Sequence, residues 1–218
     1  SLMTDAHIPL ALADAASQQT GVLVAPALNF GVSPSFATYP GTIRATGAID
    51  VPVPTRPEDD FQPRAAAIAE RAAGAKTLLI TSPNNPTGVS YSRATLDDIA
   101  RACRDHDLWL ISDEVYDTQV WQGDPLSARA VPGLGDRCIV IGSLSKSHAM
   151  TGSRLGWMVA PGAVAEAAST LATNTTYGVP AFIQKAALAA LAMGEDFEAA
   201  VAEPFRRRRG IALQRLAG

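Results

Sequence analysis

The residues of this chain best suited to chemistry gather around Lys146, an amine among small and hydroxyl-bearing neighbours. They form the stretch Ser143-Leu144-Ser145-Lys146-Ser147-His148-Ala149-Met150-Thr151-Gly152-Ser153-Arg154. A lysine whose pKa is lowered by partial burial or a nearby cation can attack an aldehyde and form an imine. The Arg154 guanidinium can clasp a phosphate, and Ser143 and Ser145 can donate to the same anion. The stretch is typical of a site for a phosphorylated aldehyde, but a solvated serine-rich loop also explains it.

A second polar cluster, Asp113-Glu114-Val115-Tyr116, follows the apolar segment 108–112. A carboxylate at the end of a strand can pair with a pyridinium nitrogen and so turn the ring into an electron sink. The Tyr116 hydroxyl can donate to an oxygen on the same ring. An aspartate that caps a helix, beside a half-buried tyrosine, explains the same residues.

The third cluster, Ser82-Pro83-Asn84-Asn85-Pro86-Thr87-Gly88, has the composition of a turn. Only the Asn85 amide adds a functional expectation, because it can donate to a ring oxygen. All three clusters follow apolar segments, and ligands of parallel α/β sheets bind outside the carboxyl ends of the strands. We therefore expect the clusters to meet at one site.

The elements that would position these clusters alternate between helix and strand from about residue 63. The sequence predicts helices over 63–73, 92–107, 164–173 and 181–193, and strands over 77–81, 108–112, 138–141 and 157–160. Strands that are apolar on both faces fit a sheet covered by helices on both sides. The predicted class is α/β, with a mostly parallel sheet and helices on both faces. We expect this fold to be incomplete, because helical sequence continues up to Gly218.

Composition narrows the class of partner and the compartment. The formal net charge of -3 and the pI of about 5.6 argue against a nucleic acid or an anionic membrane as the main partner. Cys103 and Cys138 lack the spacing of a zinc site or a disulfide framework, so no metal is expected. No apolar segment approaches the roughly 20 residues of a membrane span, and we expect a cytoplasmic protein.

Together the three clusters resemble the class I/II aminotransferase family, which consists of fold-type I pyridoxal-phosphate enzymes. The resemblance extends over about 49–218 and includes Arg154-Leu155-Gly156-Trp157. It implies a partial large domain of the PLP-dependent transferase type over 49–218, with pyridoxal 5'-phosphate (PLP) as the cofactor. The implied reaction moves an amino group between an amino acid and a 2-oxo acid, both small-molecule substrates.

The resemblance also implies a role for each site residue. Lys146 would carry the cofactor as an internal aldimine and move a proton from the substrate Cα, and Asp113 would bind the pyridine nitrogen. Tyr116 would contact the ring hydroxyl and completes the catalytic set of Lys146, Asp113 and Tyr116. The residues expected to bind the cofactor are Asn85, Asp113, Tyr116, Ser143, Ser145, Lys146 and Arg154.

Residues 1–48 form a loop-rich N-terminal segment with a weaker resemblance to the creatininase family of metal-dependent amidohydrolases. The matching pieces are His7-Ile8-Pro9-Leu10, Val24-Ala25-Pro26-Ala27-Leu28-Asn29-Phe30-Gly31-Val32-Ser33 and Tyr39-Pro40-Gly41-Thr42-Ile43. Aligned on His7, Leu2 and Thr4 stand where that family has a glutamate and a histidine. Such a site has too few metal donors. The stretch at 39–41 fits the aminotransferase part as well.

Three functions remain open from the sequence. The first is a PLP-dependent aminotransferase, and the second is a catalytically incomplete fragment or fusion of the same fold that binds PLP weakly or not at all. The third is a creatininase-like amidohydrolase module. The resemblance further implies a homodimer, and the apolar stretch 177–183 is suited equally to that contact and to a core.

Overall fold

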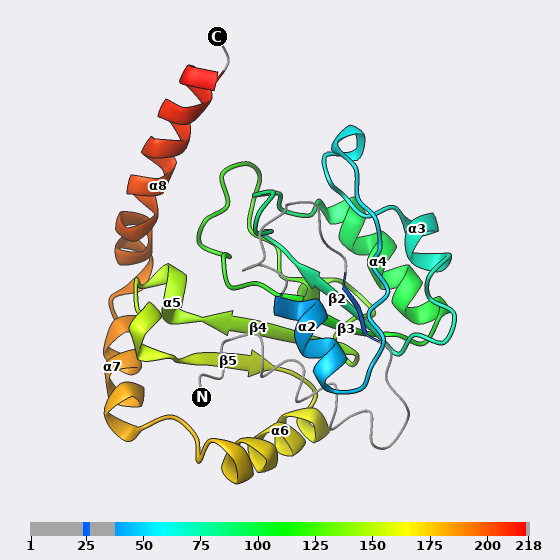
Figure 1. The fold of residues 1–218 in the computed structure, drawn as a ribbon. Helices are drawn as coiled ribbons and strands as arrows, with labels where there is room; N and C mark the ends of the chain where they lie inside the picture. The colour runs from blue at the N-terminus through cyan, green and yellow to red at the C-terminus, as the bar shows by residue number, and fades with distance from the viewer. Residues whose placement is uncertain (1–23, 27–37, 217–218) are drawn as a thin grey trace.

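Five strands form one sheet in the order β1-β2-β3-β4-β5 in this computed structural model, which describes residues 24–26 and 38–216 (Figure 1). The strands are β1 (Val24–Pro26), β2 (Thr77–Thr81), β3 (Trp109–Asp113), β4 (Cys138–Ser143) and β5 (Gly156–Val159). The first four are mutually parallel, as predicted, and β5 is antiparallel to β4. Because Ser143 pairs with Gly156, the connection between β4 and β5 begins and ends at the same edge of the sheet.

Helices α3 (Ala65–Ala69) and α4 (Arg93–Asp105) cover one face of the sheet. Apolar side chains of β2, β3 and β4 pack there against Ile68 of α3 and against Leu96 and Ile99 of α4. Ser92 caps α4, since its hydroxyl accepts a hydrogen bond from the Thr95 backbone N–H at 3.1 Å. This larger of the two apolar clusters fixes the strands whose ends carry the polar clusters.

The opposite face is covered by α2 (Thr38–Ala45) and by the start of α6 (Gly162–Thr175). Ile43 of α2 is fully buried against Leu79, Ile111 and Ile139 of the sheet, and Val164 of α6 packs at the margin. The expectation that helices cover both faces of the sheet is therefore confirmed. Every residue of β2 and β4 is buried, as strands between two helical layers must be.

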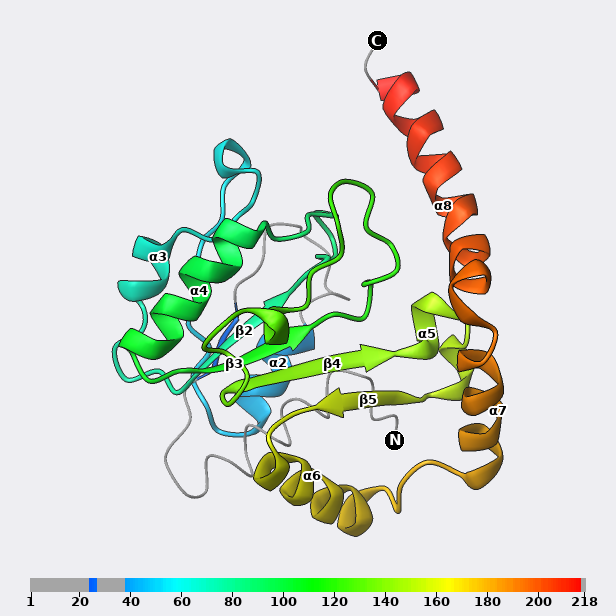
Figure 2. The same ribbon diagram turned by 180° about the vertical axis from the view of Figure 1, so that it is seen from behind.

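The remaining helices lie at the end of the sheet where β4 ends and β5 begins (Figure 2). The short helix α5 (Leu144–Ser147) follows β4, and α7 (Ala181–Leu191) leads into the long α8 (Gly194–Leu216). Three 3-10 turns are η1 (Pro57–Asp59), η2 (Ala128–Ala130) and η3 (Thr151–Ser153). None of the helices among the described residues is long and apolar enough to cross a membrane.

The boundaries of the predicted elements agree with the structure to within two residues, except for the first predicted helix, 63–73, which is shorter in the structure. α3 ends at Ala69 because backbone N–H groups that follow it donate to carbonyl oxygens three residues earlier rather than four. Arg71 donates to Ile68, Ala72 to Ala69 and Ala75 to Ala72, and Gly74 has φ +76°. These tighter turns, rather than a continued helix, lead the alanine-rich segment into β2.

Candidate active site

The three polar clusters begin at the carboxyl ends of neighbouring parallel strands. Asp113, the last residue of β3, pairs in register with Thr81 at the end of β2 and with Ile141 near the end of β4. The tertiary structure therefore brings the segments that follow residues 81, 113 and 143 to one edge of the sheet. This is the edge at which parallel α/β sheets bind ligands.

Asn84 and Asn85 differ in what they do in the turn after β2. Asn84 is buried, and its amide accepts hydrogen bonds from the backbone N–H of Thr87 at 3.1 Å and from the Thr87 hydroxyl at 2.7 Å. It also donates to Thr81 Oγ1 at 2.5 Å. Asn84 thus shapes the turn, which leaves the exposed Asn85 amide at the mouth of a cavity.

Asp113 is held from two sides. Its Oδ1 accepts a hydrogen bond from the Val115 backbone N–H at 3.1 Å, and its Oδ2 accepts one from the Tyr39 hydroxyl. Tyr39 belongs to α2, which precedes β2 in the sequence. Two donors to one carboxylate stabilise its ionised form, which is the form that can pair with a pyridinium nitrogen.

Tyr116 connects the Asn85 turn to Lys146. Tyr116 and Asn85 line one open cavity of about 180 Å³, together with Gln119 and Trp121. The Lys146 Nζ atom lies 5.7 Å from the centroid of the Tyr116 ring. An amine, a phenol and an amide therefore lie within one small region beside the end of β3.

Ser143 and Ser145 organise the start of α5. Ser143 caps the helix by accepting a hydrogen bond from the Ser145 backbone N–H at 3.1 Å, and the two hydroxyl oxygens are 2.9 Å apart. Both side chains are buried, and Ser143 Oγ is also 3.0 Å from the Leu155 carbonyl oxygen. The Ser143 hydroxyl is a donor in these contacts and must leave them to donate to an anion, whereas the Ser145 hydroxyl only accepts in this pair.

Arg154 follows η3 in a left-handed conformation, with φ +50°. One guanidinium nitrogen donates to the Thr151 carbonyl oxygen at 2.9 Å, and the Thr151 hydroxyl donates to the Ser145 carbonyl oxygen at 2.9 Å. Gly156, two residues later, pairs with Ser143 at the end of β4. The chain thus returns Arg154 to the neighbourhood of the Ser143–Lys146 segment.

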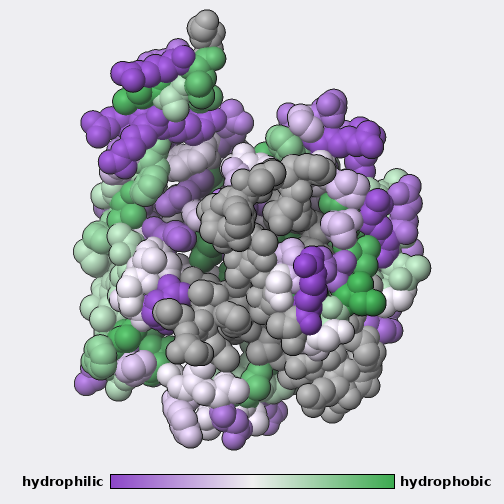
Figure 3. Space-filling model, in the orientation of Figure 1, coloured by the Kyte–Doolittle hydropathy of each residue, from purple (hydrophilic) through white to green (hydrophobic). Residues whose placement is uncertain are grey.

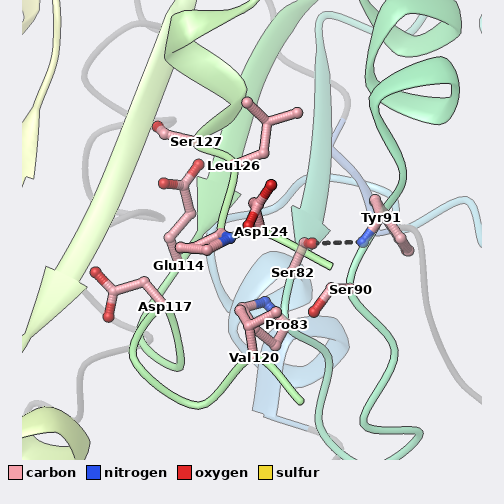
Figure 4. A pocket seen from close by; sticks show the side chains of 11 residues that line it. Ser82, Pro83, Ser90, Tyr91, Glu114, Asp117, Val120, Asp124, Leu126 and Ser127 are labelled. Carbon is pink, nitrogen blue, oxygen red and sulfur yellow. Dashed lines mark hydrogen bonds between the residues drawn. The ribbon is translucent and has the colours of Figure 1, made fainter. Parts of the chain in front are cut away.

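A second cavity of about 220 Å³ lies between the segment after β2 and the loop after β3 (Figure 4). None of the predicted site residues lines it. Its wall includes Glu114, whose Oε1 accepts hydrogen bonds from Ser112 Oγ and from the Ala128 backbone N–H, both at 2.9 Å. Burial raises the pKa of Glu114, and these hydrogen bonds partly oppose the increase. Asp113 and Glu114 are adjacent in the sequence, but their carboxylates lie in different surroundings.

Sequence reasoning gave no role to Tyr39, Gln119, Trp121 or His148. The only sequence signal for Tyr39 was that the stretch 39–41 fits the aminotransferase part of the chain. Gln119 and Trp121 reach the cavity because the chain after Tyr116 folds back, with the Gln119 N–H bonded to the Tyr116 carbonyl at 2.8 Å. His7, Leu2 and Thr4, the residues of the creatininase comparison, lie outside the described residues.

The chemistry of these groups fits pyridoxal phosphate. A primary amine is required to bind its aldehyde, an acceptor to hold the ring nitrogen and cationic or hydroxyl donors to hold the phosphate. Lys146, Asp113 and Arg154 are of these three kinds. Asp113 ends β3, and Lys146 and Arg154 lie in the segment that connects β4 to β5. Among the residues that the structure describes, no group of three or more His, Cys, Asp or Glu could hold a metal ion.

Comparisons with known proteins point to one family. A sequence model of the family described as aminotransferase class I and II matches residues 29–216. The arginine–pyruvate transaminase AruH of Pseudomonas aeruginosa is 42% identical over 185 residues, which cover 84% of this chain and 47% of that protein. An aspartate aminotransferase of Streptomyces avermitilis is 35% identical over 81% of this chain and 44% of its own length.

Solved structures agree with the sequence comparisons. The aspartate aminotransferase of Thermus thermophilus with maleate has a TM-score of 0.86 and 29% identity, and the match covers 97% of this chain and 55% of that one. The chain therefore spans about half the length of the relatives it matches. The family match begins at residue 29 and so includes Tyr39. The division of the chain near residue 48 remains a prediction.

Proposed function

Because this chain belongs to the class I and II aminotransferase family, we propose that it binds pyridoxal 5'-phosphate through Lys146 and transfers amino groups. The substrates are an amino acid and a 2-oxo acid. The proposal extends to the activity of this chain alone, which spans about half the length of its relatives. The cytoplasmic location is likewise a prediction.

One observation carries the proposal: the Lys146 amine lies 5.7 Å from the ring centroid of Tyr116, which lines the same cavity as Asn85. An amine at a sheet edge is common on protein surfaces. An amine beside a phenol and an amide, at the sheet edge where a carboxylate is held by two donors, is suited to binding and polarising a substituted pyridine ring.

Pyridoxal phosphate, when bound, supplies an aldehyde for amines and a ring that withdraws electrons from the substrate Cα. Asp113 would accept a hydrogen bond from the protonated ring nitrogen, and the Tyr39 hydroxyl, which donates to Asp113, would orient its carboxylate. Tyr116 and Asn85 would donate to the ring oxygen. Arg154, Ser143 and Ser145 would hold the phosphate, with the guanidinium as the only cation among these three.

Lys146 has two tasks. Its amine would hold the cofactor through the aldehyde, and as a free amine it would take a proton from the substrate Cα and hold that proton for return. The bound cofactor would supply the carrier of the amino group between the two substrates.

The first experiment tests attachment of the cofactor to Lys146. The chain is incubated with pyridoxal phosphate, scanned for visible absorbance, reduced with borohydride and digested. Mass spectrometry should find the reduced adduct on Lys146. Lys146→Ala should abolish both absorbance and adduct, whereas Lys185→Ala, on the exposed surface of α7, should retain both. An adduct spread over surface lysines, or equal absorbance in Lys146→Ala, would refute the proposal.

A second experiment separates an active enzyme from the alternative, a catalytically incomplete fragment of the same fold. L-arginine with pyruvate is the first substrate pair to assay, because a relative with 42% identity is named for it. Transfer of the amino group that depends on Lys146 supports the enzyme. A specific adduct on Lys146 with no turnover across amino acids and 2-oxo acids supports the incomplete fragment.

We further propose that the chain forms a homodimer through the surface of α7 and its flanking segments. Tyr177 and Phe182 are 91% and 74% exposed, so in this structure the stretch 177–183 is no core segment. Leu188, Leu191 and Met193 are also exposed, and Figure 3 shows hydrophobic colour along the left edge, over α7. Exposed apolar side chains gathered on one part of a surface are typical of an interaction site.

Light scattering tests the oligomeric state. The unmodified chain should have the mass of a dimer, and Phe182→Glu should shift it to the monomer. Ile49→Glu, which changes a 65% exposed apolar residue on a different part of the surface, should leave the dimer intact. A monomeric unmodified chain at micromolar concentration would contradict this proposal without affecting the assignment of Lys146.

A further inference from the structure

His148 is a buried histidine that has no role in the proposed chemistry. It lies two residues after Lys146 and caps α5 at its C-terminal end. Its side chain is 1% exposed, and its Nδ1 atom is 2.9 Å from Ser147 Oγ. Its ring also contacts Phe197 of α8, with ring centroids 5.6 Å apart. The imidazole therefore lies between α5, which carries Lys146, and α8.

The other ring nitrogen has no hydrogen-bond partner among the described residues. His148 Nε2 is buried, and the nearest acidic atom is Glu198 Oε1 of α8, at 3.8 Å. A buried nitrogen without a partner is costly, so such a group calls for an explanation. Figures 1 and 2 both show α5 against the start of α8, where Phe197 and Glu198 follow each other.

We propose that His148 is a positioning residue for Lys146, which fastens α5 to α8 through Glu198, and that protonation of the imidazole tightens this connection. The proposal rests on the proposed role of Lys146 in binding pyridoxal phosphate. In the neutral ring, Nε2 gains little from a carboxylate at 3.8 Å. In the protonated ring both nitrogens carry protons, so Nδ1 can donate to Ser147 while Nε2–H faces a negative charge.

The charged groups around the imidazole favour this change. Glu198 faces it from α8, and Asp117 interacts with it from the loop after β3. Lys146, two residues earlier on α5, is the nearest cation in the sequence. Burial raises the pKa of Asp117, and Glu198 raises it further, whereas His148 acts in the opposite direction. A protonated imidazole would thus relieve the repulsion between these two carboxylates.

The connection matters for Lys146 because α5 is only four residues long and has little stability of its own. α8 is 23 residues long and carries the other half of the contact. Fastening the short helix to the long one restricts the backbone that carries the reactive amine. The amine of a less restricted helix would bind the cofactor more weakly, because binding would have to order it first.

The first test is independent of the cofactor. Melting temperatures are measured for the unmodified chain, His148→Gln, Glu198→Gln and the double variant. The measurements are made at pH 5.5 and pH 8.5, which bracket the pKa of about 6.5 that histidine has in model peptides. At pH 5.5 each single substitution should lower the melting temperature. The double variant should then melt about 2–4 °C higher than the sum of the two decreases predicts. At pH 8.5 the two decreases in melting temperature should be additive.

The matched control is Glu203→Gln. Glu203 is on the same helix and pairs with Arg206 at 3.7 Å on an exposed surface, so it should show no coupling to His148 at either pH. Because Glu198 is 30% exposed, its substitution by glutamine should fold. Additive effects of His148→Gln and Glu198→Gln at pH 5.5 would overturn the proposal, as would coupling of the same size at both pH values.

The second test asks whether the connection positions Lys146. The affinity for pyridoxal phosphate is compared between Glu198→Gln and the unmodified chain at both pH values. The variant should bind about threefold to tenfold more weakly at pH 5.5 and equally well at pH 8.5. Coupling in the melting experiment with unchanged affinity would overturn the positioning role. If the unmodified chain forms no adduct on Lys146, the proposed function fails instead, and the melting experiment still decides the contact.

Discussion

The Tyr39 hydroxyl donates a hydrogen bond to Oδ2 of Asp113, although the two residues are 74 positions apart in the sequence. Tyr39 lies on α2 and Asp113 ends β3, and the packing of Ile43 against Ile111 brings these two elements together. The apolar face of a helix thus delivers a hydrogen-bond donor to the carboxylate proposed to hold the pyridine nitrogen.

Replacing Tyr39 by Phe should weaken the binding of pyridoxal phosphate about tenfold, because a hydrogen bond to a charged group contributes about 1.5–3 kcal/mol. Equilibrium titration followed by absorbance measures the loss. Tyr177→Phe removes a hydroxyl from a side chain that is 91% exposed, and it should bind as the unmodified chain does. Equal affinities for both variants would show that the Tyr39 hydroxyl does not support Asp113.

Glu114 should make stability depend on pH. Burial raises its pKa above the ordinary 4.5, so the folded state binds the proton more tightly than the unfolded state. Its contribution to stability is therefore greatest below pH 4.5 and is lost as the pH rises through the folded-state pKa. Glu114→Gln keeps an acceptor for Ser112 and Ala128 and carries no charge.

The melting temperature of Glu114→Gln should match that of the unmodified chain near pH 4 and exceed it by about 2–4 °C at pH 8, where the buried charge is absent only in the variant. Replacing the exposed Glu70 by Gln should give no such divergence. A variant that is less stable than the unmodified chain at pH 8 would mean that the ionised carboxylate is the preferred partner of its two donors.

Gly156 is required by the close approach of β4 and β5. A Cβ atom on Gly156 would lie 2.8 Å from the Gly142 carbonyl oxygen, a backbone atom that cannot turn aside. Gly156→Ala should therefore lower the free energy of unfolding by about 1–3 kcal/mol. Gly162→Ala, at the start of α6 where nothing lies within 4 Å of the added methyl group, is the matched control in urea unfolding. Equal stability of the two variants would contradict the geometry.

Arg154→Lys tests whether the phosphate is held by a forked guanidinium. A lysine keeps the charge but offers no pair of parallel donors, and we expect about tenfold weaker binding of pyridoxal phosphate. Arg93→Lys, on the exposed surface of α4 beside Asp97, should bind normally. Pyridoxal without its phosphate should bind equally to the unmodified chain and to Arg154→Lys. A phosphate-independent loss would assign Arg154 a structural role through Thr151.

The sequence predicted the strands β2 to β5 and the helices α3, α4, α6 and α7 because their signals are local. The segment 77–81 consists of leucine and β-branched residues, and it forms β2 with the predicted boundaries. The first predicted helix was too long because alanine content indicates helix propensity, whereas Gly74 and the turns before β2 depend on where the strand must begin. Ligands of parallel sheets bind at the carboxyl ends of the strands, and on that basis the sequence also predicted that the three polar clusters meet at one edge.

By itself, then, the sequence determined the α/β class, the order of the strands' polar ends and the chemical identity of the groups at that edge. Only the tertiary structure decided that Tyr39 supports Asp113, that Glu114 turns into a different cavity from its neighbour and that His148 meets Glu198. The physical reason is that propensity, periodicity and motif spacing act over a few residues. Contacts between α2 and β3, or between α5 and α8, depend instead on how apolar faces pack, and no spacing along the chain encodes them directly.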